Sequence, residues 1–463
     1  MSDDEARALA RDTAERLVAS AGTGTASPDL GEGAPGIALA LLHAAELFDD
    51  DGCLRAGQLQ LRRTAEATAT TPLTSAGLYS GTAGIVWVVA EYARRESRYL
   101  PTLTTMTDQL ARQSLALRHP LSAGSVAPYD YDVLEGAAGR LAALLKAAEV
   151  LGRPATGATR EAIDDLVDYL LALTHADGSS GVNGDGVPKW VCTAASYPTA
   201  LGTGAETATG RWYAETFPEG HFNLGFAHGP PGVLAALCRA DLARSHGVVG
   251  RDGRGDARAR RVRQRIDALV RQIDAWRLDG HDDPAWAALV PPDPATGLPD
   301  TGAAQEPARA AWCYGAPGIA ASLLSAAKAS AACGTPGGAA DLAAAALLGV
   351  RRAPAEQQRL FSPTVCHGLA GLLAICGRAA AHTRAPELRQ MCAELRSRLC
   401  AYADPDHPYL FADRPVPERP EHRPGLLTGA AGVLLALLGS VSPEAAAWDE
   451  VLFLTRSESQ SRV

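Results

Sequence analysis

A cysteine and a histidine stand side by side in the stretch SPTVCHGLAGLLAIC, residues 362–376, directly before a glycine that opens an apolar run. Cys366 and His367 have a counterpart in WCYGAPG, where Cys313 lies two residues before Gly315. Two thiols and one imidazole form a typical zinc ligand set. Three protein ligands leave a coordination position open, as in catalytic zinc sites, whereas structural sites are closed by four. We therefore predict one zinc ion held by Cys313, Cys366 and His367.

Two more polar side chains precede similar glycines. His228 lies directly before Gly229 in AHGPPG, and Asp132 lies shortly before Gly136 in YDVLEGAAG. Two alternatives to a catalytic zinc site stay open at this point. Either the cysteines are ordinary reduced thiols, or His228 is a fourth ligand and the site is structural. The positive end of a helix favours thiolates, and this supports the zinc interpretation.

The glycines belong to a repeat that organises the whole chain. The pattern G-x-x-G, followed by an apolar run, recurs seven times, with copies beginning at residues 33, 81, 136, 229, 315, 368 and 429. Other segments, such as 5–20, 160–173, 258–276 and 386–402, carry apolar residues at helical spacing and charges elsewhere, which is typical of amphipathic helices. Fully apolar helices belong inside a fold and amphipathic ones outside.

This alternation predicts an all-α fold: a single-domain α/α toroid over residues 1–463, with seven inner helices wrapped by seven outer ones. An open superhelix of helix pairs is the competing architecture. We favour closure because the pattern extends from near residue 5 to near residue 440 without polar capping repeats. All seven glycine turns then gather at one end of the ring, and the polar residues of copies three to six become neighbours.

A wide gap separates the third and fourth copies of the repeat. Residues 174–225 are rich in Gly, Ser and Thr. Long loops inside compact proteins are usually functional or disordered. We predict that this region is an irregular, loop-rich insertion over the end of the ring where the turns meet.

Composition and charge exclude several classes of protein. The net charge of -9 argues against a nucleic-acid partner, whose phosphates require a basic surface. No run of 18 apolar residues occurs, so we expect no membrane span. The start, MSDDEARALARDTAERL, is acidic and lacks an apolar signal region, which indicates a cytoplasmic protein. The nine cysteines should then be mostly reduced.

The motifs WCYGAPG and CHGLAG, together with AHGPPG and DVLEGAAG, resemble those of the lanthionine cyclase family, the LanC-like proteins. The resemblance covers nearly the whole chain, because the repeated G-x-x-G turns are themselves a family feature. It implies an α/α toroid, a bound zinc ion and a substrate peptide with a leader, whose Ser and Thr were dehydrated by a separate dehydratase. The implied reaction adds a peptide Cys thiol to dehydroalanine or dehydrobutyrine and closes a (methyl)lanthionine ring. A complex with the dehydratase and an exporter is a further possibility.

The resemblance also implies a role for each matching residue. Cys313, Cys366 and His367 match the zinc ligands, His228 the acid/base histidine, Asp132 a catalytic carboxylate and Arg309 an active-site arginine. Trp312 and Tyr314 flank the ligand Cys313, and Tyr314 is a further candidate catalytic residue. We expect Arg309 to stabilise the enolate oxygen and His228 to protonate the α-carbon. Asp132 would orient His228 or receive the thiol proton.

Three other functions fit parts of these observations. A protein prenyltransferase β-subunit also combines a toroid with zinc, but the aromatic content of 5% argues against an isoprenoid pocket. A family relative could add a soluble thiol such as glutathione to dehydrated peptides. A zinc-stabilised toroid could bind peptides without catalysis, and a closed four-ligand site would favour this last alternative.

Overall fold

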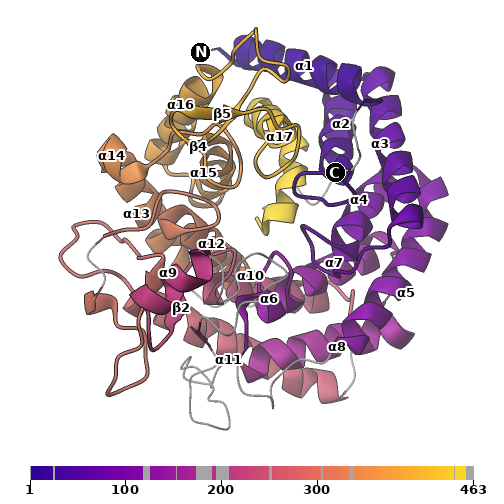
Figure 1. The fold of residues 1–463 in the computed structure, drawn as a ribbon. Helices are drawn as coiled ribbons and strands as arrows, with labels where there is room; N and C mark the ends of the chain where they lie inside the picture. Colours follow the sequence, from indigo (N-terminus) through magenta and orange to yellow (C-terminus); the bar gives the residue numbers. More distant parts are fainter. Residues whose placement is uncertain are drawn as a thin grey trace.

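The computed structural model describes residues 2–23, 27–117, 126–152, 154–173, 190–193, 208–249, 253–303, 306–332, 338–442 and 444–454. Within these ranges two concentric layers of helices surround a common centre (Figure 1). The inner helices are α2 (Ala34–Phe48), α4 (Thr82–Arg95), α7 (Ala137–Val150), α10 (Pro230–Ser245), α12 (Gly315–Ala332), α15 (Leu369–Thr383) and α17 (Ala430–Val441). The outer helices are α1 (Asp3–Ser20), α3 (Asp51–Thr70), α5 (Leu100–Ala116), α8 (Gly157–Ala172), α11 (Gly253–Ala275), α13 (Ala339–Arg352) and α16 (Pro386–Cys400).

The inner layer is a closed ring. Each inner helix packs against the next one along the chain, and α17 packs against α2. The outer helix α1 lies against both α17 and α2 and covers this closure. The predicted α/α toroid is therefore confirmed, and an open superhelix is excluded.

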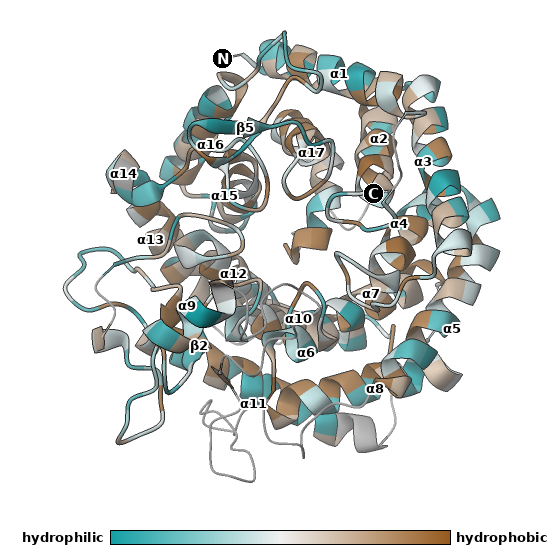
Figure 2. Ribbon diagram, viewed as in Figure 1, coloured by the Kyte–Doolittle hydropathy of each residue, from teal (hydrophilic) through white to brown (hydrophobic). Residues whose placement is uncertain are grey.

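The two layers differ in how much of each helix is buried. In α17 the residues from Ala430 to Leu438 are all buried, as the uniformly apolar sequence predicts. In α1 only one face is buried, consisting of Ala6, Ala10, Thr13, Ala14 and Leu17. Figure 2 shows the same contrast, with hydrophilic residues concentrated on the outer helices.

The second glycine of each copy allows neighbouring turns to approach the inner helix. A Cβ atom on Gly318 would lie 2.3 Å from the carbonyl oxygen of Trp312 and 2.7 Å from Cβ of Phe226. A Cβ atom on Gly232 would lie 2.4 Å from the carbonyl oxygen of Phe226 and 2.6 Å from a methyl carbon of Val133. No residue with a side chain fits such a gap without displacing backbone, so these positions require glycine.

Backbone hydrogen bonds join the seven turns in a closed circuit. Each turn donates a backbone N–H to a carbonyl oxygen of a neighbouring turn, over 2.8–3.3 Å. The donor–acceptor pairs are Gly31–Tyr79, Tyr79–Leu134, Val133–Ala227, Ala227–Cys313, Cys313–Cys366, Cys366–Leu427 and Leu427–Gly31. Every donor except Val133 lies two residues before the first glycine of its copy. Equivalent residues of adjacent copies are therefore held side by side, and these include Cys313 and Cys366.

The segment after α17 turns back into the centre of the ring. It forms the 3₁₀ helix η5 (Glu444–Leu452) and continues to Leu454, seen in yellow inside the ring in Figure 1. Phe453 and Leu454 are buried, and the hydroxyl of Tyr79 donates to the carbonyl oxygen of Val451 over 2.8 Å. The indole N–H of Trp312 donates to the carbonyl oxygen of Leu452 over 3.2 Å. This segment fills the centre of the toroid beneath the turns.

Buried ion pairs fasten the same segment to the inner ring. Arg378 of α15 binds both carboxylate oxygens of Asp449 over 2.6 Å each. Lys146 of α7 lies 2.7 Å from a carboxylate oxygen of Glu91 and 2.6 Å from one of Glu450. Such charges are stable in a protein interior only when they are paired, so the pairs made by Asp449 and Glu450 hold the segment in one position.

The substitution Asp449→Asn should lower the free energy of unfolding by about 3–5 kcal/mol, because it leaves the Arg378 guanidinium buried without a counter-charge. The two side chains are only 7% and 3% exposed. Glu394→Gln is the matched control, since Glu394 pairs with Arg351 at the surface, with exposures of 44% and 28%, and should cost less than about 1 kcal/mol. Denaturant unfolding of both variants provides the measurement, and equal losses would contradict a role for the buried pair.

Short strands and turns complete the structure. The strands β1 (Val191–Cys192), β2 (His221–Asn223) and β3 (Leu289–Val290) form an antiparallel sheet, with Phe222 paired to Val191 and Val290. The strands β4 (Asp413–Val416) and β5 (Arg419–Glu421) form a hairpin. Small helical elements are η1 (Ser97–Tyr99), α6 (Pro128–Tyr131), α9 (Ala208–Thr216), η4 (Thr301–Ala303) and α14 (Ala355–Gln358). No helix in the described ranges is both long and apolar enough to span a bilayer.

Much of the region predicted as a loop-rich insertion, 174–225, falls outside the described residues, namely 174–189 and 194–207. Its described part contains β1, α9 and β2. In Figure 1, α9 and β2 lie on the same face of the ring as α6 and the β4–β5 hairpin. Its role as a cover over this end stays a prediction.

Candidate metal and acid–base site

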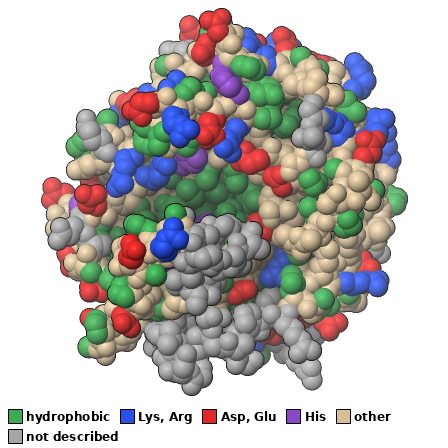
Figure 3. Space-filling view, in the orientation of Figure 1, with side chains coloured by type: hydrophobic (Ala, Val, Ile, Leu, Met, Phe, Trp, Pro, Cys, Tyr) green, Lys and Arg blue, Asp and Glu red, His purple; other side chains and the backbone are tan. Residues whose placement is uncertain are grey.

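The predicted site residues lie on turns of four adjacent copies of the repeat. Asp132 precedes α7, His228 precedes α10, Cys313 precedes α12, and the pair Cys366–His367 precedes α15. Figure 3 shows a hollow at the centre of this face, with an apolar floor and with basic, acidic and histidine side chains around it. The closed circuit of turns thus gathers residues that are more than 200 positions apart in the sequence.

The two cysteines interact through both backbone and side chain. The N–H of Cys313 donates to the carbonyl oxygen of Cys366 over 3.3 Å. A hydrogen bond from the Cys366 thiol lowers the pKa of Cys313 to about 7 despite its desolvation, and the charges of His367, His228 and Arg309 act in the same direction. The same hydrogen bond, together with desolvation, raises the pKa of Cys366. One thiol of the pair is therefore prepared to ionise, as a metal ligand or nucleophile must.

His367 is held from behind by a carboxylate. Its Nε2 atom lies 3.2 Å from Oδ1 of Asp413, the first residue of β4. Histidines that bind metals typically hydrogen-bond a carboxylate or carbonyl group through their second nitrogen. Asp413 could not be identified from the sequence, because it lies in no repeated motif and is 46 positions away from His367.

The donor set fits a zinc ion in chemical type. It combines two sulfurs in contact with a histidine whose outer nitrogen is already bonded to a carboxylate. All cysteines in the described ranges are free thiols. In the part of the chain that the structure describes, however, no three His, Cys, Asp or Glu side chains converge as a preformed metal cluster. The two thiols bond each other in this structure, so zinc ligation would require the cysteine side chains to reorient.

His228 and Asp132 form an acid–base pair in which the carboxylate is fully buried and the imidazole half-buried. Nδ1 of His228 lies 2.6 Å from Oδ2 of Asp132, and Oδ1 of Asp132 accepts hydrogen bonds from the backbone N–H groups of Glu135 (2.7 Å) and Gly136 (2.8 Å). Desolvation alone would lower the pKa of His228, but the hydrogen bond and charge of Asp132 raise it above its ordinary value. Asp132 therefore both orders the turn before α7 and orients His228.

Arg309 contacts the turn that carries the proposed ligands. Its Nη2 donates to the carbonyl oxygens of His367 (3.1 Å) and Arg359 (3.2 Å), and its guanidinium carbon lies 5.0 Å from the ring centre of Phe361. Its Nε–H is buried and has no hydrogen-bond partner among the described residues. This arginine therefore keeps a spare donor close to Cys313 and Cys366, whose charges both act on it.

Tyr314 lies between the two parts of the site. Its hydroxyl accepts a hydrogen bond of 3.1 Å from the side-chain amide of Asn223, and burial raises its pKa. Its ring centre lies 6.4 Å from that of His228. Asn223 ends β2 and was not identified from the sequence, because a three-residue strand produces too short a pattern to detect.

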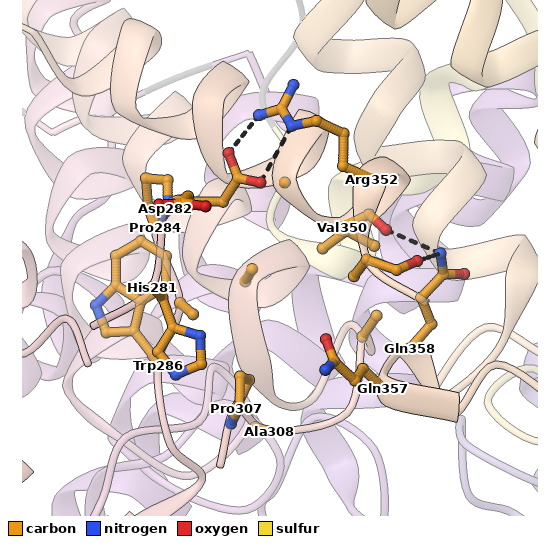
Figure 4. Close-up of a pocket in the computed structure, with 16 residues that line it drawn as sticks. His281, Asp282, Pro284, Trp286, Pro307, Ala308, Val350, Arg352, Gln357 and Gln358 are labelled. Carbon is orange, nitrogen blue, oxygen red and sulfur yellow. Dashed lines mark hydrogen bonds and ion pairs between the residues drawn. The ribbon is translucent and has the colours of Figure 1, made fainter. Parts of the chain in front are cut away.

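A separate cavity of about 470 Å³ lies near Arg309 but contains none of the predicted site residues. It is lined by parts of residues 281–286, 307–316 and 349–358 (Figure 4). Among its polar groups, Arg352 pairs with Asp283 over 3.1 Å, and the Gln358 amide donates to the carbonyl oxygen of Val350 over 2.9 Å. We therefore do not assign this cavity to the chemistry of the cysteines and histidines.

Known proteins share this architecture. A family model described as lanthionine synthetase C-like protein matches residues 24–453. Nisin cyclase has a similar structure, with a TM-score of 0.69 and 18% identity over 96% of this chain and 97% of that chain. At this level of identity the likeness shows the fold. A possible member of the GH105 family from Salmonella enterica gives a TM-score of 0.36 with 14% identity, over 80% of this chain and 88% of that chain, which is too weak to carry an argument. A search of curated proteins found no match.

Proposed function

Because this chain belongs to the lanthionine synthetase C-like family, we propose that it is a zinc-dependent lanthionine cyclase acting on dehydrated peptides. The thiol of a peptide cysteine adds to the β-carbon of a dehydroalanine or dehydrobutyrine in the same peptide. The new S–Cβ bond replaces the carbon–carbon π bond, and the α-carbon takes up a proton. The main observation behind this proposal is that the Cys313–Cys366 contact and the His228–Asp132 pair lie on adjacent, hydrogen-bonded turns of the ring.

Cys313, Cys366 and His367 would hold the zinc ion. When bound, zinc would lower the pKa of the substrate thiol and fix the position of its sulfur. Orientation of two reacting groups can contribute several kcal/mol to a rate. The carbonyl contacts of Arg309 with His367 keep this turn in place, and so help to orient whatever the turn binds.

Arg309 is the proposed donor to the developing enolate. Attack on the β-carbon moves charge onto the carbonyl oxygen of the dehydrated residue. The Nε–H of Arg309 has no partner among the described residues, and because it is buried, the guanidinium would have to turn to bring this N–H to that oxygen. A hydrogen-bond donor directed at such an oxygen stabilises the developing charge.

His228 is the proposed proton donor to the α-carbon. The Asp132 carboxylate accepts from Nδ1, which leaves Nε2 as the nitrogen that can exchange a proton with substrate. The raised pKa of His228 keeps a useful fraction of imidazolium near neutral pH. Asp132 acts through His228 in this scheme, as a positioning residue.

The pH dependence of the reaction tests this assignment. The protonated form of His228 is the active one, so kcat/KM should fall as pH rises through its pKa. Because Asp132 raises that pKa, Asp132→Asn should move the falling limb of the profile to lower pH. Asp130→Asn is the control, since Asp130 accepts from the backbone N–H of Ala127 instead and should leave the limb in place. An unmoved limb in Asp132→Asn would exclude His228 as the titrating acid.

Mass spectrometry of a dehydrated peptide tests the function directly. Ring closure leaves the peptide mass unchanged and removes one free thiol, which then no longer reacts with an alkylating reagent. Addition of glutathione, the alternative reaction, would raise the mass. Binding without any loss of thiol would identify a non-catalytic peptide-binding protein. We place the reaction in the cytoplasm, where thiols stay reduced, after a dehydratase and before an exporter.

A further inference from the structure

Asp413 lies at a junction between the candidate metal site and the β4–β5 hairpin. It is 2% exposed, and its Oδ1 atom lies 3.2 Å from Nε2 of His367. The hairpin brings it there, since Asp413 pairs with Glu421 across β4 and β5. The inference drawn from it rests on the proposed function only in taking His367 as a metal ligand.

The hydrogen bonds around Asp413 indicate that its Oδ1 atom acts as an acceptor. Oδ1 also accepts from the hydroxyl groups of Ser362, over 2.8 Å, and Thr364, over 3.3 Å. The two hydroxyl groups also lie 2.9 Å apart, and the Ser362 oxygen accepts from the backbone N–H groups of Thr364 (3.3 Å) and Arg414 (3.4 Å). The carboxylate is an acceptor in each of its contacts with them. An oxygen surrounded in this way is an acceptor for every neighbour, including the imidazole.

We propose that Asp413 is a positioning residue that holds His367 in the tautomer protonated at Nε2 and thereby presents Nδ1 as the metal-binding nitrogen. A histidine nitrogen binds a metal only through an unprotonated lone pair. Without the carboxylate, the imidazole can rotate and place its proton on either nitrogen. Ser362 and Thr364 lie on the same turn as His367, so the network orients the ring relative to Cys366 as well.

Zinc affinity, measured by competition with a chromogenic chelator, tests this role in the full-length protein. Asp413→Asn should weaken zinc binding by about 10–100-fold, the effect typical of losing a carboxylate behind a ligating histidine. Glu421→Gln is the matched control: it neutralises a carboxylate of the same hairpin that pairs with Arg423 and not with His367, and should change the affinity by less than about threefold. Wild-type affinity in Asp413→Asn, with or without a loss of stability, would overturn the proposal.

A second measurement does not depend on the variant folding. Nitrogen-15 NMR of the zinc-free wild-type protein, with the His367 signals assigned from a His367→Gln spectrum, should show the proton on Nε2. A proton on Nδ1 would overturn the inference. If the tautomer and the affinity loss are as expected but dehydrated peptide is not cyclised, the proposed function fails and the positioning role stands. If Asp413→Asn cyclises peptide normally with unchanged zinc affinity, the proposed function stands and the positioning role fails.

Discussion

Replacing Cys313 with alanine should remove zinc and ring closure together. Cys313 is one of two thiols that are held in contact by the circuit of turns, and no other cysteine in the described ranges lies at this position of the repeat apart from Cys366. With one thiolate lost, one sulfur and one imidazole remain, too few to form a stable zinc site. We expect the rate of ring closure to fall by about 1,000-fold or more, because both thiol ionisation and orientation are lost.

Metal analysis and a ring-closure assay on the same sample provide the measurement. Cys392→Ala is the matched control, because Cys392 is a half-buried thiol on α16, away from the turns. This variant should retain one zinc ion and near-normal activity. Full zinc occupancy in Cys313→Ala would show that Cys313 is not a ligand, and full activity without zinc would show that the metal is not needed.

Replacing His228 with asparagine should separate metal binding from catalysis. His228 bonds Asp132 and not the cysteines, so the variant should retain its zinc. Loss of the proton donor should slow ring closure by about 100- to 10,000-fold, the usual range for general acid–base catalysis. Asparagine keeps a polar group beside Asp132 and limits the loss of stability.

Zinc content and turnover are again measured together, with His246→Asn as the control, since His246 is an exposed residue at the end of α10. The control should behave as wild type in both measurements. If His228→Asn loses its zinc, His228 is a fourth ligand and the site is structural. If it retains both zinc and full turnover, another group supplies the proton.

The toroid could be predicted from the sequence because the pattern that produces it, a G-x-x-G turn followed by an apolar helix, recurs seven times. Each G-x-x-G turn marks the start of an inner helix, and each amphipathic segment has too little apolar surface to be an inner one. The proximity of Cys313 and Cys366 could be predicted from the same pattern, because the two residues occupy equivalent positions in adjacent copies. Their role as metal ligands stays a prediction.

The features that were missed arise from contacts between distant segments. Asp413 and Asn223 each belong to a strand of three or four residues, which is too short to produce a detectable alternation. Buried Lys146 and Arg378 lie in helices made mostly of apolar residues, and their partners Glu450 and Asp449 come from a segment without a periodic pattern. Only the folded ring shows that these charges neutralise one another.

Residues 444–454 occupy the middle of the ring, where Trp448, Leu452 and Phe453 are buried, so a chain cannot be threaded through it. Under the proposed function, a peptide substrate would therefore enter and leave by the face that carries the turns. Neither of its ends would have to enter first, so a peptide with a folded protein fused to either end should still be a substrate.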